Sequence, residues 1–143
     1  MLKALALSAL LTLTGAAAAQ AQEPTGAALV EALFGQLESE VLPGLAVSSR
    51  ARGVLAAEAM AEHDFTVVAG RAYVAVGLCD ENCSDLDLAI GDVNDEVVDS
   101  DVLDDDSPMV VFTAATSGTY NATVLMARCE GRCNYGVRVY QQR

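Results

Sequence analysis

Four cysteines are the residues best suited to chemistry, and they form two pairs of identical spacing. Cys79 and Cys83 are separated by three residues, as are Cys129 and Cys133. Two cysteine pairs could build a four-thiolate zinc site, although zinc pairs and redox-active pairs more often have two intervening residues. In an exported chain, an even number of cysteines predicts disulfides. Each pair stands where a predicted strand ends in a short polar loop, which favours the local bridges 79–83 and 129–133 over the crossed bridges 79–133 and 83–129.

Carboxylates are the second group with chemical potential, and they are concentrated in one segment. Residues 80–106 hold ten aspartates and two glutamates, and no basic residue occurs between Arg71 and Arg128. Such a block of like charge is usually a solvated loop. The alternative is a divalent cation, because calcium takes about six to eight oxygen ligands from carboxylates, carbonyls and water. No contiguous calcium-binding loop with its required glycine and glutamate is present, so a calcium site would be assembled from separate loops.

Asp85 and Asp87 are the first candidate ligands. They alternate with leucines in the run DLDLAI, residues 85–90. A strand would therefore place both carboxylates on one face, about 7 Å apart, with the apolar residues on the other face. Asp101 and the aspartates at positions 104–106 would add further oxygens if their loop folds back.

Groups for catalysis are few. His63 is the single histidine, and neither a Gly-x-Ser-x-Gly nor a His-Glu-x-x-His motif occurs. Paired carboxylates also perform glycoside hydrolysis, but the chain has no tryptophan to form a sugar platform. The sequence therefore predicts a protein that is not an enzyme, with a weak hydrolase based on Asp85 and Asp87 as an alternative.

Residues 1–21 have the pattern of a secretory signal peptide. A lysine at position 3 precedes an apolar run over residues 4–13, and Ala19-Gln20-Ala21 is a signal-peptidase pattern. The apolar run is shorter than the roughly 20 residues that a membrane-spanning helix needs. We therefore expect export to the periplasm or the exterior, with no stable membrane insertion after the signal is removed. The net charge of −12 argues against nucleic acid or anionic lipid as a partner.

An amphipathic helix is predicted over residues 25–42, followed by the helix-stopping pair Pro43-Gly44. Its apolar stripe must pack against the domain that follows or against a partner chain. Residues 45–62 are ambiguous, because an alanine-rich composition favours helix whereas the short valine and leucine clusters fit a strand.

A period of two begins at His63 and predicts an antiparallel β-sandwich or jelly roll. In the last run, Val137 and Val139 should point inward, and Arg138 and Tyr140 outward. Residues 99–108 are predicted to be a long acidic connection. The six alternating runs are DFTVVAG, RAYVAVGLC, DLDLAIGD, PMVVFTAA, GTYNATVLMARC and YGVRVYQQ.

The order of these motifs resembles the bacterial pre-peptidase C-terminal domain, which is found appended to secreted proteases and in other exported proteins. The resemblance covers roughly residues 53–143, and its most specific parts are D-L-D-L at residues 85–88 and S-G-T-Y at residues 117–120. This chain differs in its two cysteine pairs, in Asn94-Asp95 where a glycine-containing turn is common, and in having no protease before the module.

The resemblance implies a jelly-roll-like sandwich and a non-catalytic module, in some members calcium-binding or attached to polymeric substrates. It also implies a strand, a turn and a second strand where residues 53–68 are otherwise ambiguous. Position by position, it marks Asp85, Asp87, Asp99 and Asp101 as the carboxylates for calcium.

The sequence as a whole predicts an all-β, jelly-roll-like antiparallel β-sandwich preceded by one N-terminal helix. Its expected parts are a signal peptide over residues 1–21, a helical segment and linker over residues 22–52, and the sandwich over residues 53–143. We expect an exported binding or structural module that is stabilised by calcium and recognises an unknown protein or an extracellular polymer. The alternative is a small interaction protein that docks on its partner through helix 25–42.

Overall fold

One helix and eight strands form the protein in a computed structural model that describes residues 21–143. The signal peptide expected over residues 1–21 therefore falls, apart from its last residue, outside the described residues. The elements are α1 (Gly26–Glu40), β1 (Leu45–Ala56), β2 (Met60–Val67), β3 (Ala72–Cys79), β4 (Cys83–Gly91), β5 (Val97–Asp101), β6 (Met109–Thr113), β7 (Gly118–Cys129) and β8 (Arg132–Gln142).

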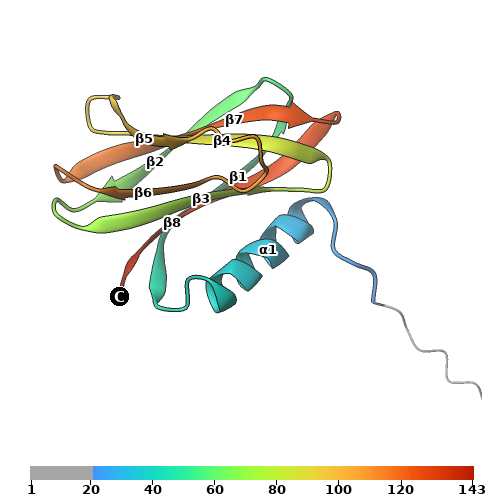
Figure 1. Ribbon diagram of the computed structural model, residues 1–143, viewed down its shortest axis with the longest axis horizontal. Helices are drawn as coiled ribbons and strands as arrows, with labels where there is room; N and C mark the ends of the chain where they lie inside the picture. Colours follow the sequence, from blue (N-terminus) through green and yellow to red (C-terminus); the bar gives the residue numbers. More distant parts are fainter. Residues whose placement is uncertain (1–20) are drawn as a thin grey trace, which may run out of the picture.

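The strands build two four-stranded antiparallel sheets that pack face to face (Figure 1). One sheet has the order β1-β8-β3-β6 and the other β2-β7-β4-β5. The pairs nest along the chain, because β1 pairs with β8, β2 with β7, β3 with β6 and β4 with β5. This nesting is that of a jelly roll, and the predicted fold class is confirmed.

The six predicted runs correspond to β2, β3, β4, β6, β7 and β8. The strand, turn and second strand that the resemblance implies over residues 53–68 correspond to the end of β1 and to β2, and β5 is an addition. Strand β1 starts at Leu45, so residues 45–52 belong to the sheet and are not a linker. The prediction of a connection over residues 99–108 was wrong at its beginning. Residues 99–101 are the end of β5, whose backbone pairs with β4 although four of its five side chains are exposed.

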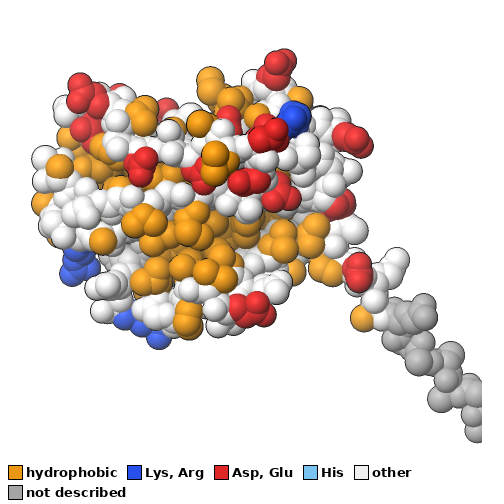
Figure 2. All heavy atoms as spheres, viewed as in Figure 1, with side chains coloured by type: hydrophobic (Ala, Val, Ile, Leu, Met, Phe, Trp, Pro, Cys, Tyr) orange, Lys and Arg blue, Asp and Glu red, His pale blue; other side chains and the backbone are white. Residues whose placement is uncertain are grey.

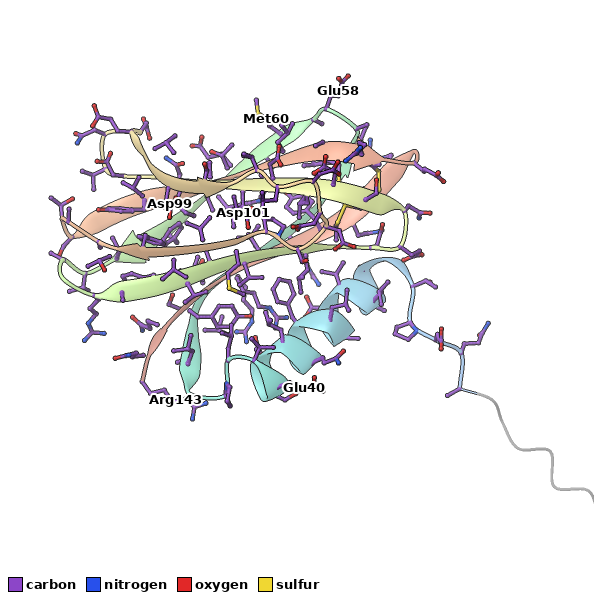
Figure 3. The ribbon with its side chains drawn as sticks, in the orientation of Figure 1. Glu40, Glu58, Met60, Asp99, Asp101 and Arg143 are labelled. Carbon is purple, nitrogen blue, oxygen red and sulfur yellow. A yellow bond between two sulfur atoms is a disulfide. The ribbon has the colours of Figure 1, made fainter. Side chains whose placement is uncertain are left out.

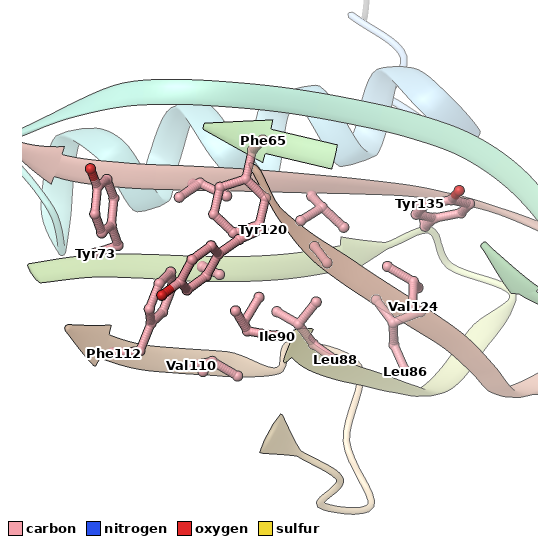
Figure 4. Packing of buried hydrophobic residues seen from close by; sticks show 14 of the residues in the cluster. Phe65, Tyr73, Leu86, Leu88, Ile90, Val110, Phe112, Tyr120, Val124 and Tyr135 are labelled. Atoms are coloured by element: carbon pink, nitrogen blue, oxygen red, sulfur yellow. The ribbon is translucent and has the colours of Figure 1, made fainter. Parts of the chain in front are cut away.

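The core between the sheets is formed by the inward side of each alternating run (Figure 4). Leu86, Leu88 and Ile90 of β4 are completely buried, as the period of two predicts. The aromatic residues Phe65, Tyr73, Phe112 and Tyr120 gather in one region of this core, with ring centroids 5.5–6.4 Å apart.

Helix α1 packs on the outer face of the β1-β8-β3-β6 sheet (Figure 1). Val30 and Phe34 are its buried residues, and they lie over Gly136 of β8. A Cβ atom on residue 136 would lie 2.7 Å from the Phe34 ring, so only glycine permits this close approach. The apolar stripe of the helix is thus covered by the sandwich that follows it in the chain.

The helix also changes the environment of the last strand. Arg138 and Tyr140 point to the outer face of β8, as the alternation predicts, but they are only 6% and 1% exposed. The predicted outward direction is confirmed, and the two side chains are buried because α1 covers this part of the sheet.

Candidate functional site

The loop between Cys79 and Cys83 joins three parts of the fold. Asp80 is 2% exposed, and one of its carboxylate oxygens accepts hydrogen bonds from the backbone N–H and the side-chain amide of Asn134, both at 2.7 Å. Its neighbour Glu81 accepts a hydrogen bond of 2.8 Å from the N–H of Gly26, the first residue of α1. These two carboxylates tie the loop to β8 and to the helix, so their role is structural.

Both disulfides are local. Cys79 bonds to Cys83 and Cys129 bonds to Cys133, so no cysteine of the chain remains free. The preferred pairing is confirmed, and the four-thiolate zinc site is excluded because zinc binds thiolates. The two loops lie side by side, since Cys83 pairs with Cys129 across β4 and β7. This proximity explains why the spacing alone left the crossed bridges open.

Asp85 and Asp87 lie on the outer face of the β2-β7-β4-β5 sheet, opposite the buried leucines of β4. A carboxylate oxygen of Asp85, Oδ2, is 3.1 Å from the Arg128 guanidinium, which also pairs with Asp104. The other oxygen, Oδ1, is buried and has no hydrogen-bond partner among the described residues. An unpaired buried carboxylate oxygen is costly, so this atom offers a ligand position.

Asp99 and Asp101 do not share that face. They pair with Ile90 and Leu88, and directly opposed residues project to the same side of a sheet. They therefore belong to the inner side of the edge strand, where Figure 3 places them between β5 and β6. The Asp101 carboxylate accepts backbone hydrogen bonds from Leu103 at 3.2 Å and Met109 at 2.9 Å. The structure thus separates the four predicted calcium ligands into two pairs.

The ionised form of Asp87 is disfavoured in this position. Burial raises the pKa of Asp87, and the negative charges of Asp85 and Asp101 raise it further. A cation beside Asp85 and Asp87 would relieve this repulsion. Over residues 21–143, however, no cluster of three or more histidine, cysteine, aspartate or glutamate side chains is arranged to hold a metal ion. The arrangement fits, at most, a cation held by these two carboxylates and completed by water.

His63 joins the two sheets. Its Nε2 atom is 2.8 Å from the hydroxyl oxygen of Tyr135, a residue only 3% exposed in β8. Burial lowers the pKa of His63 and raises that of Tyr135, so both are held in their neutral forms. A Cβ atom on Gly53 would be 2.7 Å from the tyrosine hydroxyl, so glycine makes room for this pair. The contact with Tyr135 thus engages the Nε2 atom of the histidine.

An ionic cluster around the buried Arg138 holds α1 on the sheet. The Arg138 guanidinium pairs with Glu31 and, at 2.7 Å, with Glu38, both from the helix. It also lies 4.2 Å from the centre of the Phe34 ring, a cation–π contact. The Tyr140 hydroxyl donates a hydrogen bond of 3.2 Å to Glu38, and burial together with this carboxylate raises the pKa of Tyr140.

Sequence reasoning missed the parts played by Asp80, Tyr135 and Arg138. Arg138 had a detectable signal, because it is a charge in the middle of an otherwise apolar run, YGVRVY. The predicted helix over residues 25–42 carries the acidic side chains that such a charge could pair with. Asp80 and Tyr135 had none, because each stands among residues of its own kind and nothing local marks its partner, 54 and 72 residues away in the chain.

Within residues 21–143, no helix combines the length and the hydropathy needed to cross a membrane. When the chain was compared with known proteins, no family model and no curated protein matched it.

Proposed function

We propose that this protein is an exported, non-catalytic β-sandwich module that acts by binding or as a structural element. One observation carries the proposal: the cysteines, the histidine and the most buried carboxylate are committed to holding the fold. The four cysteines are in disulfides, and the single histidine is bonded to a buried tyrosine. The most buried carboxylate, Asp80, is saturated by hydrogen bonds. A catalyst needs such groups free and directed at a substrate.

Two further features support export and a role outside the cytoplasm. Disulfides persist in oxidising compartments, and this chain places its two bridges in adjacent loops. The signal pattern of residues 1–21 fits the same destination. In this proposal the module recognises a protein or an extracellular polymer, the role implied by its resemblance to the pre-peptidase C-terminal domain.

The structure favours this reading over one in which helix 25–42 docks on a partner. Val30 and Phe34 of α1 are 3% and 1% exposed because they pack on the sheet of the same chain. A helix that used this stripe for a partner would first have to leave Arg138 without its two carboxylates.

A panel of ester, peptide and glycoside substrates tests the non-catalytic role. We expect no turnover above the rate of the buffer, because the cysteines are held in disulfides and the histidine is engaged with Tyr135. The double variant Asp85→Asn with Asp87→Asn is the comparison. Turnover by the parent chain that disappears in a folded double variant would contradict the proposal and identify a hydrolase.

Calcium stabilisation is a second candidate function, favoured by the unpaired Oδ1 atom of Asp85 and by the raised pKa of Asp87. We propose that one calcium ion binds weakly between these two carboxylates, with water completing its coordination. Arg128 already neutralises part of the charge on Asp85, so affinity should be low.

Thermal unfolding in millimolar calcium and in chelator tests this site. At ten times the dissociation constant a ligand contributes about 1.4 kcal/mol, so we expect calcium to raise Tm by several degrees. The variant Asp85→Asn with Asp87→Asn should lose this increase. A matched control, Glu62→Gln with Asp64→Asn, removes two exposed carboxylates from β2 of the same sheet and should keep it. Equal Tm values of the parent chain in calcium and in chelator would reject the site.

A further inference from the structure

The four edge strands of the sandwich differ in charge. The sheet orders make β1, β6, β2 and β5 the edges. Three of them carry charges, namely arginines 50 and 52 on β1, Glu62 and Asp64 on β2, and aspartates 99 and 101 on β5. Strand β6 has none, and residues 107–127 contain no charged side chain. Charged edge residues prevent strands from pairing with other chains, and β6 lacks this protection.

The hydrogen-bond pattern shows which backbone groups of β6 are available. The N–H of Gly77 bonds to the carbonyl of Pro108, and the N–H of Ala114 bonds to that of Arg71. In an antiparallel pair the groups of alternate residues point to the same neighbour, so the even-numbered residues of β6 face β3. The odd-numbered residues Met109, Val111 and Thr113 therefore direct their N–H and C=O groups to the open edge.

One end of this edge is already capped. The N–H of Met109 donates to the Asp101 carboxylate at 2.9 Å, which brings a negative charge to the beginning of β6. The backbone groups of Val111 and Thr113 have no such partner among the described residues. The available edge is therefore the second half of β6.

The outer side of β6 is also apolar. Val111 is 59% exposed and Met109 is 38% exposed, and Val111 lies beside the half-buried Val74 of β3. Figure 2 shows hydrophobic side chains gathered between the strands and the helix. The half-buried Leu33 and Leu37 of α1 pack against the same cluster as Val74. An exposed apolar area beside an unprotected strand edge is typical of an interaction surface.

We propose that β6 is a self-association edge and that two copies of this chain pair antiparallel through it. Each copy has a net charge of −12, so two copies repel each other. Pairing is least opposed at an edge strand without charged side chains, and among the four edge strands of the described residues β6 is the one that has none. The register that uses the available groups sets Val111 of each copy opposite Thr113 of the other. Each of these two pairs can exchange both backbone hydrogen bonds. The register leaves the bond between Met109 and Asp101 intact.

This pairing closes on itself. Because the same strand serves both copies, the contact is two-fold symmetric and produces a dimer, not an open fibre. The joined sheet has the order β1-β8-β3-β6-β6-β3-β8-β1, so its new ends are the β1 strands with their exposed arginines. On the outer face, Val111 of each copy lies beside Thr113 of the other and diagonally across from the other Val111.

Sedimentation equilibrium of the purified chain over a wide concentration range tests the proposal. We expect a monomer–dimer equilibrium, and we expect Val111→Lys to abolish the dimer because it places a charge on the shared edge. The matched control is Val54→Lys, which changes a valine that is 43% exposed on the other edge of the same sheet and should leave the dimer unchanged. Both variants should keep the parent circular dichroism spectrum, since neither side chain is buried.

Amide hydrogen exchange at low and high concentration locates the contact independently of any substitution. The N–H groups of Val111 and Thr113 should gain protection as concentration rises, whereas those at the open edge of β1 should not change. A chain that stays monomeric at every concentration would overturn the proposal. The proposal would also be overturned if Val111→Lys dimerised like the parent, if protection appeared at other amides, or if species larger than the dimer formed.

Discussion

Replacing Phe34 with alanine should lower the free energy of unfolding by about 3–5 kcal/mol, the usual loss when a buried aromatic side chain is removed. Phe34 is 1% exposed and fills the space above Gly136, where a Cβ atom would come within 2.7 Å of its ring. Its ring also carries the Arg138 guanidinium at 4.2 Å. The substitution would leave a cavity between α1 and the sheet and remove the cation–π contact. Chemical denaturation followed by circular dichroism measures the change.

The control for this variant is Gln36→Ala, a change at an exposed position of the same helix. It should alter the free energy of unfolding by no more than about 0.5 kcal/mol. A loss below about 1 kcal/mol for Phe34→Ala would mean that the helix adds little to the fold. The alternative in which helix 25–42 docks on a partner would then gain support.

Removing the first disulfide by Cys79→Ala with Cys83→Ala should cost about 2–5 kcal/mol. Closing a loop this short contributes about 2 kcal/mol through the entropy of the unfolded chain. The remainder comes from the loop itself, because Asp80 holds the start of β8 and Glu81 holds the start of α1. Denaturation of the oxidised proteins, with amide exchange in α1 as a second readout, measures both parts.

The second disulfide provides a matched comparison, since it closes a loop of the same length. Cys129→Ala with Cys133→Ala should cost about 2 kcal/mol and leave exchange in α1 nearly unchanged, because the carboxylates that hold the helix lie in the first loop. Equal losses in the two double variants, with equal exchange in α1, would show that the Asp80 and Glu81 contacts do not depend on the bridge between Cys79 and Cys83.

The sandwich could be predicted from the sequence wherever one side of a strand is buried and the other is polar. Strand β4 is the clearest case, since its leucines are buried and Asp85 and Asp87 lie outside. Strand β1 has a different composition, with alanine and arginine in a pattern that a helix also allows. Strand β5 is too acidic to be recognised, because it lies at an edge and is held by its backbone. Its stability comes from pairing with β4, which a local pattern does not report.

The candidate site was predictable only in part. The local disulfides followed from loop length, and the common face of Asp85 and Asp87 followed from a period of two. The place of Asp99 and Asp101 did not follow, because it depends on the register between β4 and β5. The clusters around Asp80, Tyr135 and Arg138 depend on contacts between distant parts of the chain, which spacing does not encode.

The nested pairing of the strands determines when the chain can fold. Helix α1 and strand β1, which are made first, both lie against β8, which is made last, and the ion pair of Glu38 with Arg138 spans 100 residues. Until residues 132–142 are present, β1 lacks its partner strand and α1 lacks part of the surface it packs on. Each step outward from the β4–β5 hairpin closes a longer loop. A chain with this topology therefore completes its structure only when its last strand is available for pairing.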